Sequence, residues 1–130
     1  MKKILVLLSL TVLSFGSFAQ ASDVVFKATS HSFGKIKQNI PASYTFTFTN
    51  TSAKPLVIEV ATAGCGCTTP EYSKEPVAKG KTSNIKVTYN AANPGTFTKD
   101  VTVKFANIAK PVLLTIKGEV TVPKTAVKSK

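Results

Sequence analysis

The sequence predicts an all-β domain with the architecture of a two-sheet sandwich of about seven strands. Apolar residues alternate with polar ones in several segments rich in Val, Ile, Thr, Phe and Tyr, whereas helical periodicity is almost absent. Turn residues separate these segments at intervals typical of a sandwich. The 130 residues, 43% of them hydrophobic, suffice for one domain with its own core.

Seven segments are predicted as strands. The clearest is 44–49, where aromatic side chains point to one face and threonines to the other, so that one face is core and the other is wet. Segment 32–36 is predicted as a first edge strand. The remaining strands are predicted at 24–27, 56–60, 85–89, 101–105 and 112–117.

The inward positions of these strands predict the core, and local turn chemistry predicts the reversals. Asn50 and Ser52 offer side-chain bonds to the backbone after one strand, and Pro94 followed by Gly95 fits a tight turn before another. The predicted core residues are Phe26, Phe33, Tyr44, Phe46, Phe48, Ile58, Ile85, Val87, Tyr89, Val101, Val103 and Leu114.

Residues 1–21 have the pattern of a secretory signal peptide. Two lysines precede a short apolar run, and the small residues Ala19 and Ala21 form an A-x-A cleavage site. We expect cleavage after Ala21, with Ala19 as the alternative, and a periplasmic or secreted protein without a transmembrane segment. The predicted organisation is a signal peptide at 1–21, a domain at 22–120 and a flexible basic tail at 121–130.

The charge balance is strongly basic, with 17 Lys and Arg against 6 Asp and Glu and a formal net charge of +11. Loss of Lys2 and Lys3 with the signal peptide lowers the charge from +11 to +9. Every basic residue is a lysine, and the lysines are scattered singly, so the chain offers no arginine fork for guanine or phosphate. Export also separates the chain from nucleic acid, and no nucleic-acid partner is predicted.

Residues 63–81 are the longest stretch without a strand-like pattern. This stretch holds both cysteines, together with two prolines and three glycines. A long loop on a compact scaffold is often functional. The predicted functional loop consists of Gly64, Cys65, Gly66, Cys67, Thr68, Thr69 and Pro70.

The chain resembles the secreted bacterial family known as domain of unknown function 1573. The resemblance is most specific at residues 64–70 (GCGCTTP), and it extends through 31–34 (HSFG), 46–58 (FTFTNTSAKPLVI), 94–97 (PGTF) and 116–120 (IKGEV). It implies an immunoglobulin-like sandwich in the cell envelope, similar to major-sperm-protein and pilus-chaperone domains. It implies no known activity.

Several chemistries are open to Cys65 and Cys67. In an extended chain their Cα atoms would lie about 6.5–7 Å apart, so a disulfide requires the chain to fold back at Gly66. Such a small ring would be readily reduced and would add little stability. The alternatives are a structural pair, a redox pair, an intermolecular bond, and a metal site, for which copper(I) suits two thiolates better than zinc does.

Other candidate residues favour ordinary structural roles. His31 is expected to be a structural histidine rather than a ligand, and Glu71 and Glu75 are expected to pair with Lys74 and Lys79. No set of nucleophile, base and acid is visible, and no cofactor is predicted. We therefore expect a non-catalytic module that binds another envelope protein or a surface polymer, with a small redox or copper-handling protein as the alternative.

Overall fold

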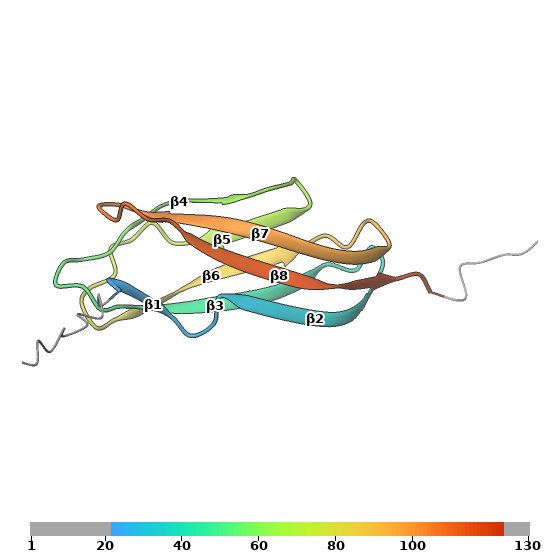
Figure 1. Ribbon diagram of the computed structural model, residues 1–130, viewed down its shortest axis with the longest axis horizontal. Coiled ribbons are helices and arrows are strands. Elements are labelled where there is room, and N and C mark those ends of the chain that lie inside the picture. Colours follow the sequence, from blue (N-terminus) through green and yellow to red (C-terminus); the bar gives the residue numbers. More distant parts are fainter. Residues whose placement is uncertain (1–21, 124–130) are drawn as a thin grey trace, which may run out of the picture.

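The computed structural model describes residues 22–123, and this part of the chain contains eight β-strands (Figure 1). This part contains no helix that could cross a membrane. The predicted signal peptide, and residues 124–130 of the predicted tail, lie outside it. The strands are β1 (Val24–Phe26), β2 (Ser30–Lys37), β3 (Ala42–Asn50), β4 (Ile58–Ala63), β5 (Thr68–Tyr72), β6 (Thr82–Tyr89), β7 (Gly95–Phe105) and β8 (Val112–Thr121).

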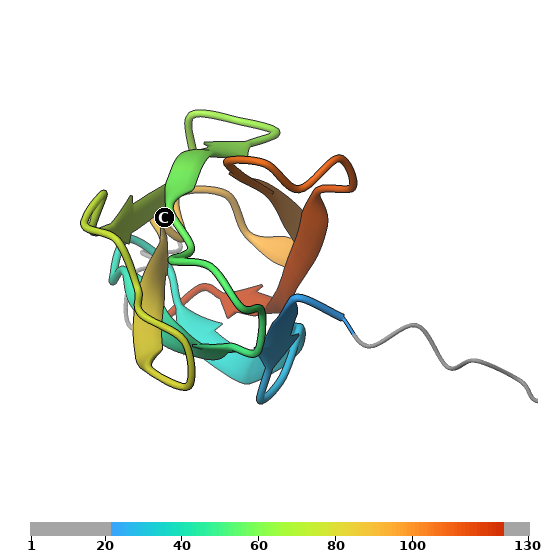
Figure 2. The same ribbon diagram turned by 90° about the vertical axis from the view of Figure 1, so that its left-hand side faces the viewer.

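Two four-stranded sheets face each other. One has the order β1-β3-β6-β5 and the other the order β2-β8-β7-β4. Figure 2 looks along the strands and shows how they surround the core. The consecutive strands β1 and β2 belong to different sheets, and β2 is an edge strand that pairs in parallel with β8. The predicted all-β sandwich is confirmed, as is the edge position of β2.

The prediction of about seven strands missed β5, which falls within the stretch 63–81, where the sequence has no strand-like pattern. Proline is rare inside strands because it has no N–H to donate, and Pro70 hid the pattern. β5 tolerates this proline as an edge strand that pairs only with β6. The strand predicted at 56–60 lies slightly later in the chain, because β4 begins at Ile58. Leu56 instead forms an isolated bridge with Val77.

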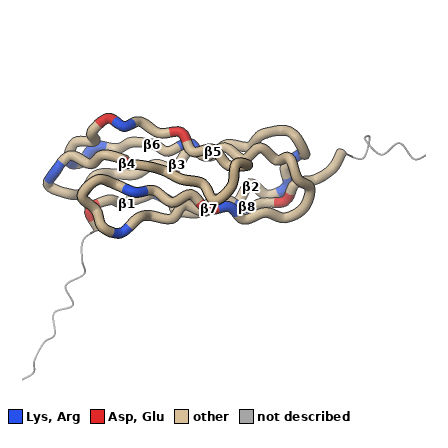
Figure 3. The backbone as a smooth tube through the Cα atoms, turned by 90° about the horizontal axis from the view of Figure 1, so that it is seen from above, with Lys and Arg blue, Asp and Glu red and all other residues tan. Residues whose placement is uncertain are grey.

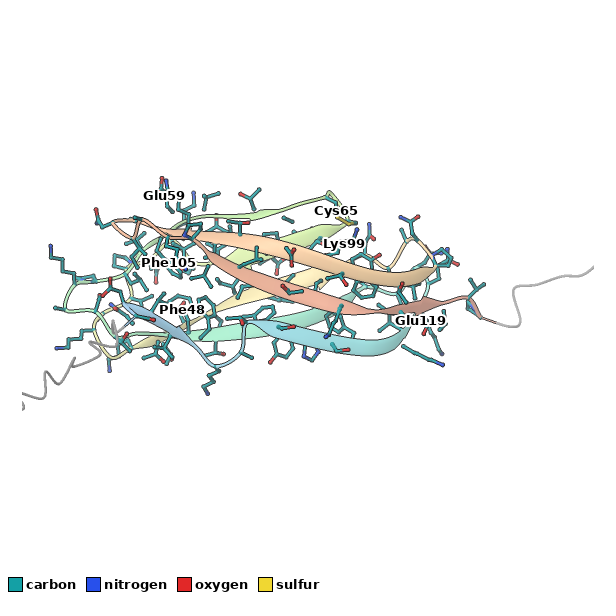
Figure 4. All side chains as sticks on the ribbon, in the orientation of Figure 1. Phe48, Glu59, Cys65, Lys99, Phe105 and Glu119 are labelled. Carbon is teal, nitrogen blue, oxygen red and sulfur yellow. A yellow bond between two sulfur atoms is a disulfide. The ribbon has the colours of Figure 1, made fainter. Side chains whose placement is uncertain are left out.

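The core lies between the sheets and follows the alternation of the strands. Nine of the twelve predicted core residues are buried, whereas Phe26, Phe33 and Tyr44 are partly buried and pack against the others. Near one end, Phe48 and Phe105 meet edge to face, with ring centroids 5.3 Å apart (Figure 4). The core also contains eight buried residues that were not predicted: Leu56, Ala61, Val77, Ala91, Phe97, Phe105, Ile116 and Val120.

Asn50 is a fully buried polar residue that organises two loops at one end of the sandwich. Its side-chain nitrogen donates to the carbonyls of Lys54 and Val77, each at 2.8 Å. Its side-chain oxygen accepts from the backbone N–H of Ser52 at 2.9 Å and from the Ser52 hydroxyl at 2.7 Å. The predicted side-chain turn at Asn50 is therefore confirmed. The same side chain joins the β3–β4 connection to the β5–β6 connection.

Gly118 allows β2 to approach β8 closely. A Cβ atom on Gly118 would lie 2.8 Å from the carbonyl oxygen of Gly34 and 3.0 Å from two ring atoms of Phe97. Phe97 is the cross-strand partner of Gly118, so its ring fills the space above the glycine. Gly34 itself has a φ of 66°, where β2 bulges between Ser32 and Lys35.

Candidate functional site

The two cysteines lie in a short connection between the sheets. Residues 64–67, here called the Cys-Gly-Cys turn, leave β4 at the edge of one sheet and enter β5 at the edge of the other. The predicted functional loop is therefore shorter than expected, because Thr68, Thr69 and Pro70 belong to β5. They stay next to the turn, and Thr69 is exposed.

Cys65 and Cys67 form a disulfide, with Cα atoms 5.3 Å apart. This separation is shorter than that of an extended chain, so the predicted reversal at Gly66 is confirmed. Backbone bonds fix both ends of the turn. The N–H of Gly64 donates to the carbonyl of Asp100 at 3.3 Å, and the carbonyl of Cys67 accepts from the N–H of Asn90 at 2.9 Å.

The glycines of the turn are not required by its backbone geometry. Neither Gly64 nor Gly66 has a positive φ, and a Cβ atom built on either would meet nothing within 4 Å. Gly34, Gly80 and Gly95, by contrast, do adopt positive φ. The sandwich would therefore accept side chains at positions 64 and 66, and glycine leaves the surface around the disulfide open.

Thr68 contacts both sulfur atoms of the disulfide through its hydroxyl. Its side chain is almost fully buried, with a residue exposure of 4%, and its hydroxyl oxygen lies 3.8 Å from Cys65 Sγ and 3.7 Å from Cys67 Sγ. These two sulfur atoms are the hydrogen-bond partners of the hydroxyl among the described residues. Both cysteines are partly exposed, and Cys67 packs against the core.

The other candidate residues are occupied elsewhere. The His31 ring stacks on Tyr44 with centroids 3.7 Å apart. Glu71 pairs with Lys86 of the neighbouring strand at 3.7 Å, not with Lys74 or Lys79 as expected, because the unpredicted strand β5 places it there. Within residues 22–123, no three His, Cys, Asp or Glu residues gather closely enough to hold a metal ion. A copper(I) site on Cys65 and Cys67 would first require reduction of their disulfide.

Surface charge and surface shape do not point to another site. Lysine positions are spread along the length of the molecule in Figure 3 and are not confined to one end. A hollow of about 830 Å³ lies between the start of β1 and the β7–β8 connection, lined by Asp23, Ile108 and Lys110 among others. Neither cysteine lines this hollow, which is partly open to solvent.

We predict that the fold survives loss of the disulfide. A bond across one intervening residue restricts the unfolded chain only slightly, so the double variant Cys65→Ser, Cys67→Ser should lose less than about 2 kcal/mol of unfolding free energy. Urea denaturation followed by circular dichroism measures the difference. Loss of a cooperative transition in the double variant would show instead that the bond holds the sandwich together.

Comparison with known proteins supports the fold. A protein of unknown function from Porphyromonas gingivalis W83 superimposes with a TM-score of 0.65 and 13% identity, over 79% of this chain and 51% of that one, so the present chain spans about half its length. PapD-like domain 7 of human CEP192 superimposes with a TM-score of 0.66 and 6% identity, over 78% of this chain and 87% of that one. The major-sperm-protein family member WR4 of C. elegans superimposes with a TM-score of 0.53 and 10% identity, over 78% of this chain and 100% of that one.

These likenesses establish an immunoglobulin-like sandwich of the major-sperm-protein and PapD-like type, as the sequence predicted. They do not decide the activity, because the fold also matches part of the Vibrio cholerae VesB protease, of which this chain covers 32%. No curated protein matches the chain. One family model matches residues 24–120, nearly the whole described region. The chain therefore belongs to the family described as protein of unknown function (DUF1573).

Proposed function

We propose that this protein is an exported, non-catalytic binding module of the cell envelope, and that its contact surface is centred on residues 64–70. The observation that carries the proposal is the pair of open glycines. Gly64 and Gly66 leave bare backbone around a partly exposed disulfide, although the fold would accept side chains there. A binding partner gains from such an open, rigid backbone because little conformational entropy is lost on contact.

Export follows from the signal-peptide pattern at residues 1–21. The expected partner is another envelope protein or a surface polymer, and the competing contact surface is the edge of β2. An edge strand has unpaired backbone groups that can accept a partner strand. We favour the turn because loops on a rigid scaffold commonly carry function.

The two surfaces can be separated with variants that keep the fold. Gly66→Arg places a long side chain on the open turn, and Ala53→Arg places the same side chain on the exposed β3–β4 connection. In pull-downs from envelope extract, we expect the wild type and Ala53→Arg to recover the same proteins or polymers. Gly66→Arg should reduce their recovery at least about tenfold, since a clash at the centre of an interface removes more than about 1.4 kcal/mol of binding free energy.

A third variant tests the edge of β2. Lys35→Pro removes a backbone N–H from that strand, and it should leave recovery unchanged if the partner binds the turn. Full recovery with Gly66→Arg, together with loss of recovery with Lys35→Pro, would move the contact surface from the turn to the edge strand. Circular dichroism of each variant checks that the fold is retained.

A further inference from the structure

We infer that the Cys-Gly-Cys turn, together with Thr68 and Lys99, is a thiol-disulfide exchange site that accepts a protein dithiol as its substrate. Three features combine at this place: a disulfide that closes a loop too short to add much stability, a buried hydroxyl directed at both sulfur atoms, and an inward-facing lysine. This inference is independent of the binding role proposed above, because it concerns electron transfer at the sulfur atoms rather than surface capture.

The Thr68 hydroxyl is placed to stabilise a thiolate. It is almost fully buried and lies 3.7–3.8 Å from both sulfur atoms. Disulfide sulfur is a weak acceptor, so this hydroxyl gains little while the bond is intact. A thiolate formed on reduction carries a full charge and is a much stronger acceptor. The hydroxyl therefore favours the reduced, ionised form over the disulfide.

Lys99 supplies a positive charge on the same side of the sheet. Ala63 pairs with Val101, and the N–H of Gly64 donates to the carbonyl of Asp100, so the Cys-Gly-Cys turn leaves β4 beside the segment of β7 that contains Lys99. In the view of Figure 4, the labelled residues Lys99 and Cys65 fall in the same part of the molecule. Lys99 alternates with the buried Phe97 and Val101, so it faces inward, and it is partly buried itself.

The charge of Lys99 is not committed to a carboxylate in the described region. The two ion pairs within residues 22–123 are those of Lys86 with Glu71 and of Lys104 with Glu59. A lysine near a cysteine favours the thiolate, which is both the nucleophile and the better leaving group in exchange. Thr68 and Lys99 thus act on the sulfur atoms from two different strands, β5 and β7.

The exchange balances as a two-electron transfer. One thiolate of the partner dithiol attacks Cys65 Sγ, the sulfur of the cysteine outside the core cluster, and the bond to Cys67 Sγ breaks. Cys67 leaves as a thiolate, which accepts a hydrogen bond from the Thr68 hydroxyl. The second thiol of the partner, after losing its proton, attacks the partner's own sulfur in the mixed disulfide and releases Cys65. The partner ends as a disulfide, and its two protons end on the two cysteines.

The test uses dithiothreitol as the dithiol and the purified exported protein in its oxidised form. Alkylation and mass measurement follow the rate of reduction, while circular dichroism confirms that the protein stays folded. The ultraviolet absorbance of the thiolate, followed against pH in the reduced protein, gives an independent readout. The variants are Thr68→Val, which removes the hydroxyl at nearly constant shape, and Lys99→Met, which removes the charge. Thr68→Ser and Lys104→Met are their controls.

We expect the wild-type disulfide to be reduced and reoxidised reversibly in the folded protein. Thr68→Val and Lys99→Met should each slow reduction of the disulfide about tenfold. Each should also raise the midpoint pH at which the thiolate absorbance appears by about one unit, as expected for loss of one favourable contact to a charged group. Both controls should behave like the wild type. If Thr68→Val does not fold, Lys99→Met decides, because that side chain is only partly buried. Wild-type rates and titrations in the folded variants would overturn the inference, as would a disulfide that reacts only after unfolding.

Discussion

Replacing Asn50 by Asp is expected to lower the free energy of unfolding by about 3–5 kcal/mol at neutral pH, the range typical of an unpaired buried charge. The substitution exchanges an NH₂ group that donates to two carbonyls for an oxygen that faces those carbonyls without a proton. Typical domains are stable by only about 5–15 kcal/mol, so a large part of the stability is at risk. Urea denaturation at neutral pH measures the loss.

Asn84→Asp is the matched control. Asn84 is exposed, and its side-chain oxygen accepts from the Thr47 hydroxyl at 2.9 Å, a bond that a carboxylate can keep. This variant should stay within about 0.5 kcal/mol of the wild type. Burial disfavours the charged form of the carboxyl introduced at position 50, so the deficit of Asn50→Asp should shrink as the pH falls. Equal stability of the two variants at neutral pH would contradict the role assigned to Asn50.

Replacing Gly118 by Val is expected to cost about 3 kcal/mol, the upper part of the range for overpacking a filled core. The first added carbon would already lie 2.8 Å from a backbone oxygen of β2, and backbone cannot move aside as a flexible side chain can. We expect the parallel pairing of β2 with β8 to open. Amide hydrogen exchange should therefore rise first in β2, and the urea midpoint should fall.

Gly64→Ala serves as the comparison for Gly118→Val. Its added carbon has nothing within 4 Å, and its φ is not positive, so its stability should remain within about 0.5 kcal/mol of the wild type. If Gly118→Val proves as stable as Gly64→Ala, then β2 can shift away from β8 at no cost, and the close contact between the strands is not a constraint on the sequence.

The fold was predictable from the sequence because most strands have one buried face and one solvent-exposed face. In β3, Phe46 and Phe48 alternate with threonines, and this period of two is a local signal that needs no knowledge of the partner strand. β5 has no such clear signal. Its order comes from β6, with which it pairs from Thr68 to Tyr72, and from its edge position, which makes Pro70 acceptable. Such information is tertiary and is not visible in a short window of sequence.

The candidate site was only partly predictable for the same reason. The cysteines mark the turn in any reading of the sequence, and Thr68 follows them directly. Lys99 lies more than 30 positions away and looks like one of many solvated lysines until the pairing of β4 with β7 brings its strand beside the Cys-Gly-Cys turn. The signal available in the sequence was its position between Phe97 and Val101, where alternation requires an inward side chain.

The parallel contact between the second strand and the last one governs the order in which the chain can assemble. Thr121 bonds to Ile36 across 85 positions, and Ser30 pairs with Thr115, so β2 has no neighbour in its sheet until β8 has been synthesised. Contacts of such long range slow folding. A chain still lacking its last strand keeps β2 undocked and one edge of β7 open. The sheet that contains β2 can therefore be completed only after β8 has been synthesised, so the sandwich cannot assemble strand by strand from its first residue onward.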